Sequence, residues 1–303
     1  MSGTKHQSAA PAAAGPTLGI IGGSGLYDLP ELEQRSEVVV ETPFGLPSDA
    51  LITGVLHGVR VAFLPRHGRG HRLAPHELPF RANLHAMKQL GMSAVVGVSA
   101  VGSLREDVRP GELVLVDQFI DRTRGRTQES TFFGNGCVAH AHFADPVHEP
   151  LRQLALGAAR AAGAVAHDGG TYVCMEGPLF STRAESRLYR HWGCDVIGMT
   201  NLQEAKLARE AELAYTTVAL VTDYDCWHET EADVDVSAVL AVLKQNVAMA
   251  RRVGVELAKA IAGAPPISLR GSMAHSLITH GDAITADARR RLNECPLGSA
   301  ALA

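Results

Sequence analysis

Two aspartates that follow an apolar run are the first candidates for chemistry in this sequence. Tyr215 to Val221 is β-branched and apolar, a composition typical of a strand buried on both faces, and Asp223 and Asp225 come directly after it. Ligands of open parallel sheets bind beyond the carboxyl ends of the strands, so both carboxylates are predicted to lie where a substrate would. Crowded carboxylates do not readily ionise together, so one could keep its proton and act as a general acid. The alternative is a solvated loop whose aspartates cap the next helix.

Five further segments follow predicted strands and carry groups that suit an anion or a heterocycle. In chain order, the side chains concerned are Ser24, Arg66 and His67, Ser99 beside Ala100, Phe180 and Ser181, and Met199 and Thr200. Hydroxyls, an arginine and the amides of a glycine-rich turn can donate to an anion, and an aromatic ring can pack against a heterocycle. Each segment alone fits a turn, a helix cap or a core side chain. Their concentration at strand ends predicts one site for both an anion and a heterocycle.

The same segments do not match the common nucleotide or metal motifs. The glycine-rich turn lacks the last glycine of a dinucleotide fingerprint, since Asp28 stands three residues after Gly25, and no Gly-Lys-Ser/Thr follows it. His67 and His71 are four residues apart, but the glycines between them argue against the helix that would join them on a metal. Three later histidines lack the H-E-x-x-H pattern: His140, His142 and His148. We therefore expect no metal ion.

Composition and charge place the chain among soluble globular proteins. Of its 303 residues 46% are apolar and 20% charged, and the net charge of -4 implies no general attraction to nucleic acid or an anionic membrane. No apolar run reaches the roughly 18 residues that a membrane-spanning helix needs. Five cysteines without a C-x-x-C pair favour a reducing compartment, so we expect a cytoplasmic protein. Residues 1–16 are predicted to be a disordered tail, 17–264 a single α/β domain, and 265–303 a C-terminal extension.

Short apolar runs alternate with helical patterns, which predicts a mixed, mainly parallel central sheet flanked by helices. The predicted strands are Leu18–Ile21, Ala50–Leu56, Val59–Leu64, Ala94–Ser99, Leu113–Val116, Thr171–Met175, Val196–Met199 and Tyr215–Val221. The predicted helices are Pro79–Leu90, Glu149–Ala162, Ser181–Trp192, Leu202–Glu212, Val236–Ala262 and Ala283–Asn293. The second and third strands should form an antiparallel hairpin around His57-Gly58.

In sequence and order, these motifs resemble the nucleoside phosphorylases of the trimeric purine type, most closely the branch that acts on S-methyl-5'-thioadenosine. The resemblance covers residues 18 to about 262 and rests on seven stretches: GIIGGSGL, ETPFGLPSDAL, RHGRGH, VGSLRED, PGELVLVDQFIDRT, EGPLFSTRAES and VTDYDCW. It implies phosphorolysis of methylthioadenosine to adenine and 5-methylthioribose 1-phosphate, as part of purine and methionine salvage. Inorganic phosphate is then a co-substrate, and neither a metal nor an organic cofactor is implied.

The resemblance also implies a role for each candidate residue. The phosphate-binding positions correspond to Ser24, Arg66, His67, Ser99, Ala100 and Thr200. The nucleoside-binding positions correspond to Met199 under the ribose, Phe180 and Ser181 at the base, His140, Asp223 and Asp225. Asp223 matches the acid that protonates purine N7, and Asp225 matches the acceptor for the 6-amino group. His140 matches a residue that reaches the 5' substituent from a neighbouring subunit, so a homotrimer or a dimer of trimers is implied, with no nucleic acid or membrane partner.

Departures from the family pattern keep other activities open. Leu179 stands where many relatives have Arg, Gly198 where they often have Asn, and the tail after Ala264 does not match the C-terminal helix that closes over the 5' group. The alternatives are a phosphorylase of adenosine or of 6-oxopurine nucleosides, a nucleosidase that uses water, a non-catalytic nucleoside-binding module, and a metal hydrolase. We also expect Phe133 and Phe143 to be exposed around His140 unless a second subunit covers them.

Overall fold

The computed structural model describes residues 15–23, 25–26, 28–228 and 236–293, with the backbone alone described for 236–245 and 293. Ser24 and residues 1–14 of the predicted tail therefore lie outside the described residues. Eleven strands form one sheet: β1 (Thr17–Gly22), β2 (Glu33–Val38), β3 (Leu51–Leu56), β4 (Val59–Pro65), β5 (Ala94–Ser103), β6 (Leu113–Val116), β7 (Gln118–Arg122), β8 (Ala166–Asp168), β9 (Thr171–Met175), β10 (Val196–Gly198) and β11 (Ala214–Asp223).

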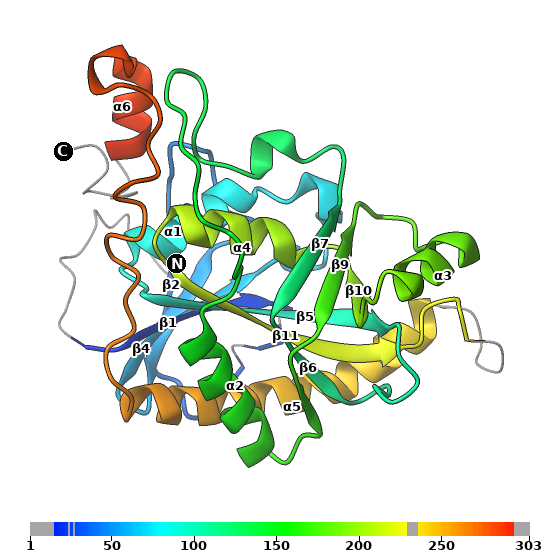
Figure 1. Ribbon diagram of the computed structural model, residues 1–303. Coiled ribbons are helices and arrows are strands. Elements are labelled where there is room, and N and C mark those ends of the chain that lie inside the picture. The colour runs from blue at the N-terminus through cyan, green and yellow to red at the C-terminus, as the bar shows by residue number, and fades with distance from the viewer. Residues whose placement is uncertain (1–14, 24, 27, 229–235, 294–303) are drawn as a thin grey trace.

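Six α-helices and three short 3₁₀ helices complete the described structure (Figure 1). The α-helices are α1 (Phe80–Gln89), α2 (Glu149–Ala161), α3 (Arg183–His191), α4 (Asn201–Glu210), α5 (Val236–Ala262) and α6 (Ala286–Asn293). The 3₁₀ helices are η1 (Pro75–Glu77), η2 (Thr127–Glu129) and η3 (Gly281–Ala283). In the view of Figure 1, α1 and α4 lie above the sheet and α2 and α5 below it.

The sheet is mixed, as predicted, and its centre is parallel. The strand order is β2-β3-β4-β1-β5-β10-β9-β7, and β11 adds to β5 and carries β6 and then β8. Strands β1, β4, β5 and β11 are parallel neighbours, whereas β2, β3 and β4 form an antiparallel meander. The β3–β4 hairpin turns at His57 and Gly58 with φ of +50° and +80°, the left-handed pair that a tight hairpin needs.

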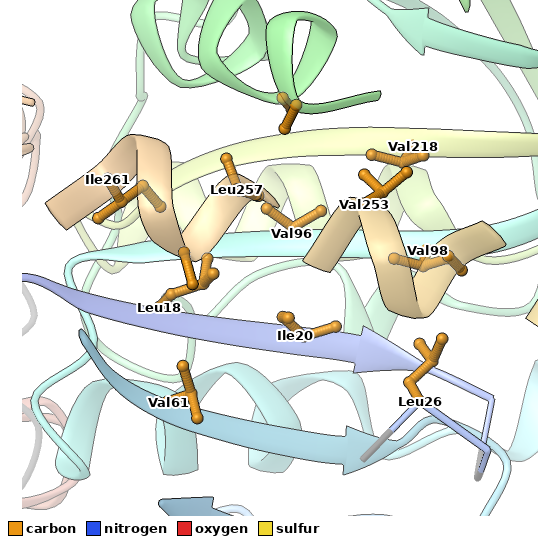
Figure 2. Packing of buried hydrophobic residues seen from close by; sticks show 14 of the residues in the cluster. Leu18, Ile20, Leu26, Val61, Val96, Val98, Val218, Val253, Leu257 and Ile261 are labelled. Carbon is orange, nitrogen blue, oxygen red and sulfur yellow. The ribbon is translucent and has the colours of Figure 1, made fainter. Parts of the chain in front are cut away.

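Both faces of the central strands are buried, which explains why their sequences are continuously apolar. In β1, Leu18 and Ile20 pack into a cluster with α2 and α5, whereas Ile21 packs on the opposite face with α1 and α4. Figure 2 shows the first cluster, in which Val253 and Leu257 of α5 lie over β1, β5 and β11. The sheet is therefore a rigid platform whose strand ends can hold functional groups.

Four strands, β1, β4, β5 and β11, are longer than predicted. Of these, β5 and β11 bring the loops of the candidate site together. β5 pairs with β1 through its first half and with β10 through its last residues, while β11 follows it along nearly its whole length. The β5–β11 register shifts between Val221 and Asp223, which places Asp223 opposite Gly102. A Cβ atom at Gly102 would lie 2.9 Å from Asp223 Oδ1, so this glycine makes room for the carboxylate.

All eight predicted strands and all six predicted helices are present, with ends that differ by up to four residues. Three strands were not predicted, namely β2, β7 and β8. β2 reads Glu-Gln-Arg-Ser-Glu-Val and is exposed along most of its length, so it has no apolar pattern to detect. Residues 265–293 pack on the core of the main unit, because Met273, Ile284 and Ala288 are buried in the cluster that contains α1 and α4.

Candidate active site

Asp223, the last residue of β11, is half-buried, Asp225 is buried, and a backbone hydrogen bond joins the two. The backbone N–H of Asp225 donates to Asp223 Oδ1 at 2.8 Å, and Thr222 Oγ1 donates to Asp223 Oδ2 at 2.7 Å. Asp225 adopts φ of +52°, a left-handed conformation that Asp tolerates better than most residues, and is only 5% exposed. The alternative of a solvated capping loop is therefore wrong.

Burial changes the acidity of both carboxyl groups. It raises the pKa of Asp223, and the nearby charge of Asp225 adds to the increase. Burial also raises the pKa of Asp225, against the hydrogen bonds that Asp225 accepts. These shifts have the direction that a general acid needs, because a carboxyl group with a raised pKa holds its proton at higher pH.

The loop between β9 and α3 reaches this aspartate pair. Ser181 Oγ donates to Asp225, at 3.0 Å from Oδ1 and 2.9 Å from Oδ2. The next residue, Thr182, is the N-cap of α3 and forms a capping box with Glu185, so the helix fixes the position of Ser181. Phe180 is 44% exposed and is free to contact a ligand. Of the predicted base-binding residues, Ser181 and Asp225 are therefore in direct contact.

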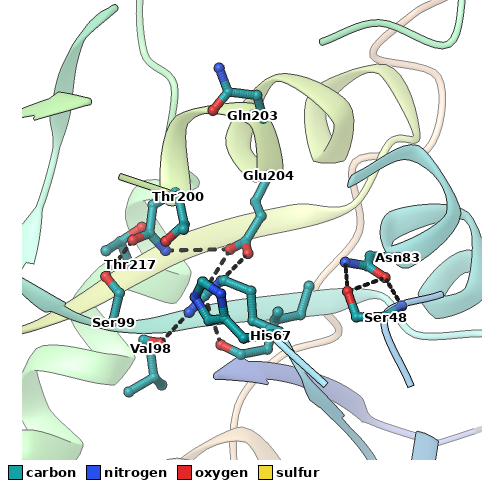
Figure 3. A network of polar contacts seen from close by, with 12 residues as sticks. Ser48, His67, Asn83, Val98, Ser99, Thr200, Gln203, Glu204 and Thr217 are labelled. Atoms are coloured by element: carbon teal, nitrogen blue, oxygen red, sulfur yellow. Dashed lines mark hydrogen bonds and ion pairs between the residues drawn. The ribbon is translucent and has the colours of Figure 1, made fainter. Parts of the chain in front are cut away.

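The predicted anion-binding arginine, Arg66, belongs to a buried polar network with Glu204 and Val98, two residues that Figure 3 labels. Arg66 is 3% exposed and forms an ion pair with Glu204 of α4, with Nε–Oε1 and Nη2–Oε2 distances of 2.5 and 3.1 Å. Arg66 also donates to the carbonyls of Val98 and Ile21. These bonds use four of its five N–H groups, so Arg66 has one Nη1 hydrogen left for an anion.

His67 is a neutral residue in this structure. Its Nδ1 lies 2.8 Å from the carbonyl oxygen of Leu73, which can only accept, so Nδ1 carries the proton. Burial, together with the charge of Arg66 and the stacked ring of His71, lowers the pKa of His67 to about 4. In this tautomer Nε2 is an acceptor, so His67 can donate a second hydrogen bond only after it takes up a proton.

Ser99 is engaged by a buried asparagine that was not predicted as part of the site. Ser99 Oγ donates to Asn201 Oδ1, and Asn201 Nδ2 donates to Glu204 at 3.3 Å and to the Tyr215 hydroxyl at 3.0 Å. The Tyr215 hydroxyl donates to Glu204 at 2.8 Å. A Cβ atom at Gly97 would lie 2.2 Å from that hydroxyl, so only glycine fits there. The network joins β5, β11 and the start of α4.

Met199 and Thr200 lie where β10 ends and α4 begins. Thr200 is the N-cap residue of α4 and is 5% exposed, and its N–H lies 3.4 Å from the Tyr172 hydroxyl. A Cβ atom at Gly177 would lie 2.6 Å from Met199 Sδ, so the base loop and this corner pack closely. Ala100 lies in β5 next to Ser99 and pairs with Leu220.

His140 lies apart from this cluster. It is exposed, and its backbone N–H donates to the carbonyl of Ser276 at 2.8 Å, next to a β-bridge between Ala139 and Leu277. No contact in the described structure joins His140 to Asp223. The expectation that Phe133 and Phe143 are exposed unless a second subunit covers them is wrong for Phe133, which is buried in a core of its own chain. Phe143 is half-buried against the cores of its own chain.

Several functional candidates were missed by sequence reasoning. They are polar residues that support the loops: Arg126, Asn201, Gln203 and Glu204, which are buried, and Glu176, which is half-buried. The only signal in the sequence is that Asn201-Leu-Gln-Glu204 puts three polar residues into the first turn of a helix that follows a buried strand. Among the described residues, no group of three or more His, Cys, Asp and Glu could hold a metal ion, and no helix is long and apolar enough to cross a membrane.

Comparisons with known proteins show the family to which the chain belongs. The family model described as "Phosphorylase superfamily" matches residues 17–259. Over 276 residues the chain is 55% identical to the S-methyl-5'-thioadenosine phosphorylase of Geobacter sulfurreducens, which covers 91% of this chain and 96% of that protein. It is 53% identical to the protein of the same name from Gloeobacter violaceus, over 91% of this chain and 93% of that one.

Solved structures show the same similarity. A methylthioadenosine phosphorylase sourced from an antarctic soil metagenomic library is 47% identical, has a TM-score of 0.87, and is matched over 92% of this chain and 98% of its own. The methylthioadenosine phosphorylase of Schistosoma mansoni, solved in complex with adenine, is 38% identical with a TM-score of 0.78, over 82% of this chain and 93% of its own.

Proposed function

Since this chain belongs to the phosphorylase superfamily, we infer that it is a pentosyltransferase that cleaves S-methyl-5'-thioadenosine with phosphate. The products are adenine and 5-methylthioribose 1-phosphate. The observation that carries the choice of an aminopurine is the bonded pair of half-buried Asp223 and buried Asp225, which Ser181 ties to the base loop. When two neighbouring carboxyl groups hold one proton between them, the protonated group is a hydrogen-bond donor and the ionised group is an acceptor.

The proposed chemistry divides between the two aspartates. Asp223, whose pKa burial raises, donates a proton to N7 of the leaving base, so that adenine departs as a neutral molecule. Asp225, ionised, accepts from the 6-amino group and is held in place by Ser181. Phe180 packs against the base, and Met199 lies under the ribose. A 6-oxopurine would present an acceptor to Asp225 instead of an amine, so inosine and guanosine are the weaker alternative.

Phosphate in this proposal binds between the ends of β1, β4 and β5 and the start of α4. Its ligands are the free Nη1 hydrogen of Arg66, protonated His67, the backbone beside Ala100, and Thr200, with Ser24 and Ser99 as further candidates. The anion stabilises the sugar as it becomes cationic, and it attacks C1' as the base leaves. No metal ion or organic cofactor is part of this proposal.

Product analysis with and without phosphate tests the proposed function. Purified protein should convert methylthioadenosine to adenine and a sugar phosphate in phosphate buffer, with and without a chelator, and should turn adenosine over more slowly and inosine least. In the same assay Asp223→Asn should lose activity. Its matched control is Asp117→Asn, which changes another aspartate after a strand, one that accepts from Gly170 N–H at 3.0 Å. Equal turnover in phosphate-free buffer would identify a nucleosidase, and loss of activity on chelation would identify a metal enzyme.

The assembly and location of the protein are part of the same proposal. We propose a homotrimer, or a dimer of trimers, in the cytoplasm, with His140 of one subunit at the 5' substituent in its neighbour's site. The support is that His140 is exposed at the surface of its own chain, apart from Asp223. The C-terminal extension supports its loop, because Val138 and Ala139 bond to Thr279 and Leu277.

A further inference from the structure

One buried arginine bonds to two loops that the proposed mechanism needs in a fixed relation. Arg126 lies just after β7, at the N-cap of η2, and is 3% exposed. Its Nη2 donates to the carbonyl oxygen of Glu176, and its Nη1 donates to the carbonyl oxygen of Met199. The first carbonyl begins the base loop that carries Phe180. The second directly precedes Thr200.

A second set of bonds locks this arginine in place. Arg126 Nε donates to the Glu176 carboxylate at 3.2 Å, and Nη1 lies 3.3 Å from Gln203 Oε1 on α4. The Glu176 carboxylate in turn accepts the backbone N–H groups of Arg124 and Gly125. Burial alone would raise the pKa of Glu176. These bonds and the charge of Arg126 instead hold that pKa below its usual value, so the carboxylate stays charged.

The packing around the guanidinium leaves little freedom. Arg126 Cζ lies 5.6 Å from the ring centroid of Phe80, the first residue of α1, in a cation–π contact. Gly177, next to Glu176, has no room for a Cβ atom against Met199. The base loop and the ribose–phosphate corner are therefore in contact, and Arg126 bonds to both.

We propose that Arg126, held by Glu176, is a positioning residue that sets the distance between the nucleoside and phosphate. The inference rests on the proposed function. The ligand contacts proposed above do not include Arg126, whose hydrogen bonds go to Glu176, Met199 and Gln203. Each ligand should therefore still bind to its own loop when Arg126 is changed. The attack of phosphate on C1' needs both ligands in one geometry, and an error of about 1 Å costs on the order of 10²-fold in rate. Removal of Arg126 should therefore lower kcat more than it raises either KM.

Arg126→Lys keeps the charge but cannot hold two carbonyls and a carboxylate with one planar group. The matched control is Arg152→Lys, because Arg152 is also buried and bonds to a carbonyl, Leu115 O, and to two carboxylates, those of Glu149 and Asp168, away from the proposed site. Both variants should lose stability to a similar degree. Calorimetric titration with adenine counts the binding-competent subunits, and kcat is expressed per competent subunit.

We expect kcat of Arg126→Lys to fall on the order of 10²-fold, with both KM values within about threefold of the original. Arg152→Lys should keep kcat within about twofold. Glu176→Gln, which removes the charge at nearly constant size, should lower kcat in the same direction and decides the matter if Arg126→Lys does not fold. The proposal is overturned if kcat per competent subunit is unchanged in both Arg126→Lys and Glu176→Gln. It is also overturned if kcat of Arg152→Lys falls as far as kcat of Arg126→Lys. If the unaltered protein does not phosphorolyse methylthioadenosine, the proposed function fails instead.

Discussion

Replacing Asp223 by Asn tests the proposed acid directly, because the structure can accept the change with little rearrangement. Asn Oδ1 can keep the bond from the N–H of Asp225, and Asn Nδ2 can donate to Thr222 Oγ1 in place of the present 2.7 Å bond. The single hydroxyl proton of Thr222, no longer needed by residue 223, can then go to the carbonyl oxygen of Val101 at 3.2 Å. The variant should therefore fold, and its loss of activity should report chemistry.

The expected loss is that of a general acid. Such groups contribute about 10²- to 10⁴-fold, so the activation free energy for methylthioadenosine should rise by roughly 3–5 kcal/mol. An Asn amide can donate to O6, so the activity ratio of inosine to methylthioadenosine should increase in Asp223→Asn. The assay is kcat/KM for both nucleosides at saturating phosphate, with Asp117→Asn as the control. Unchanged activity on methylthioadenosine would remove Asp223 from the mechanism.

The stability of the same variant has a predicted pH dependence. Burial raises the pKa of Asp223 in the folded protein, so wild-type stability is fully present below the unfolded pKa and is lost as pH rises through the folded pKa. Asn does not ionise and cannot lose stability in this way. The melting temperature of Asp223→Asn minus that of the wild type should therefore increase as pH rises from about 4 toward neutrality. A constant difference over this range would contradict the raised pKa.

Two further predictions concern histidines. His85 is fully buried among aromatic rings, with neither ring nitrogen hydrogen-bonded in the described structure, and burial lowers its pKa to about 4. The unfolding free energy of the wild type should therefore fall as pH drops from 6.5 to 4. His85→Leu should avoid up to about 3 kcal/mol of that loss, as measured by urea unfolding. Parallel pH profiles of the two unfolding free energies would contradict this cause. The second prediction is that His140→Ala and Asp223→Ala, refolded together, regain activity above the mean of the two variants alone, because some mixed interfaces pair an intact His140 with an intact Asp223. Hybrid oligomers that show no such gain would place His140 outside the neighbour's site.

The strands and the aspartate pair could be predicted because their signals are local. A strand buried on both faces needs continuous apolar residues, so β1, β5 and β11 are visible in the sequence, and polar residues just past each end stand out. The same reasoning cannot find β2, whose pairing with β3 depends on a backbone edge and not on its side chains. The left-handed backbone of Asp225 and the register shift beside it also depend on tertiary contacts.

The supporting residues could not be predicted because their partners are distant in sequence. Arg66 and Glu204 are 138 residues apart, and Arg126 bonds to a carbonyl 73 residues away. A polar residue in a strand or helix pattern gives no sign of whether it is solvated or paired, and buried charges occur only when paired. Sequence reasoning could therefore identify the loops that we propose to face a ligand, but not the buried bonds that fix those loops.

The buried partners that the sequence does not reveal change the electrostatics expected for the proposed phosphate site. The Arg66-His67 dipeptide looks like two adjacent positive donors, but Glu204 neutralises Arg66 and burial keeps His67 uncharged. The side chains of Arg66, Glu204 and His67 together therefore carry no net formal charge, although a phosphate dianion is the expected ligand. In the proposed site, phosphate therefore relies on the one free Nη1 hydrogen of Arg66, on neutral donors near the start of α4 such as Thr200, and on the proton that His67 must acquire before it can donate. An anion beside the ring raises the pKa of His67, so phosphate binding and proton uptake should occur together.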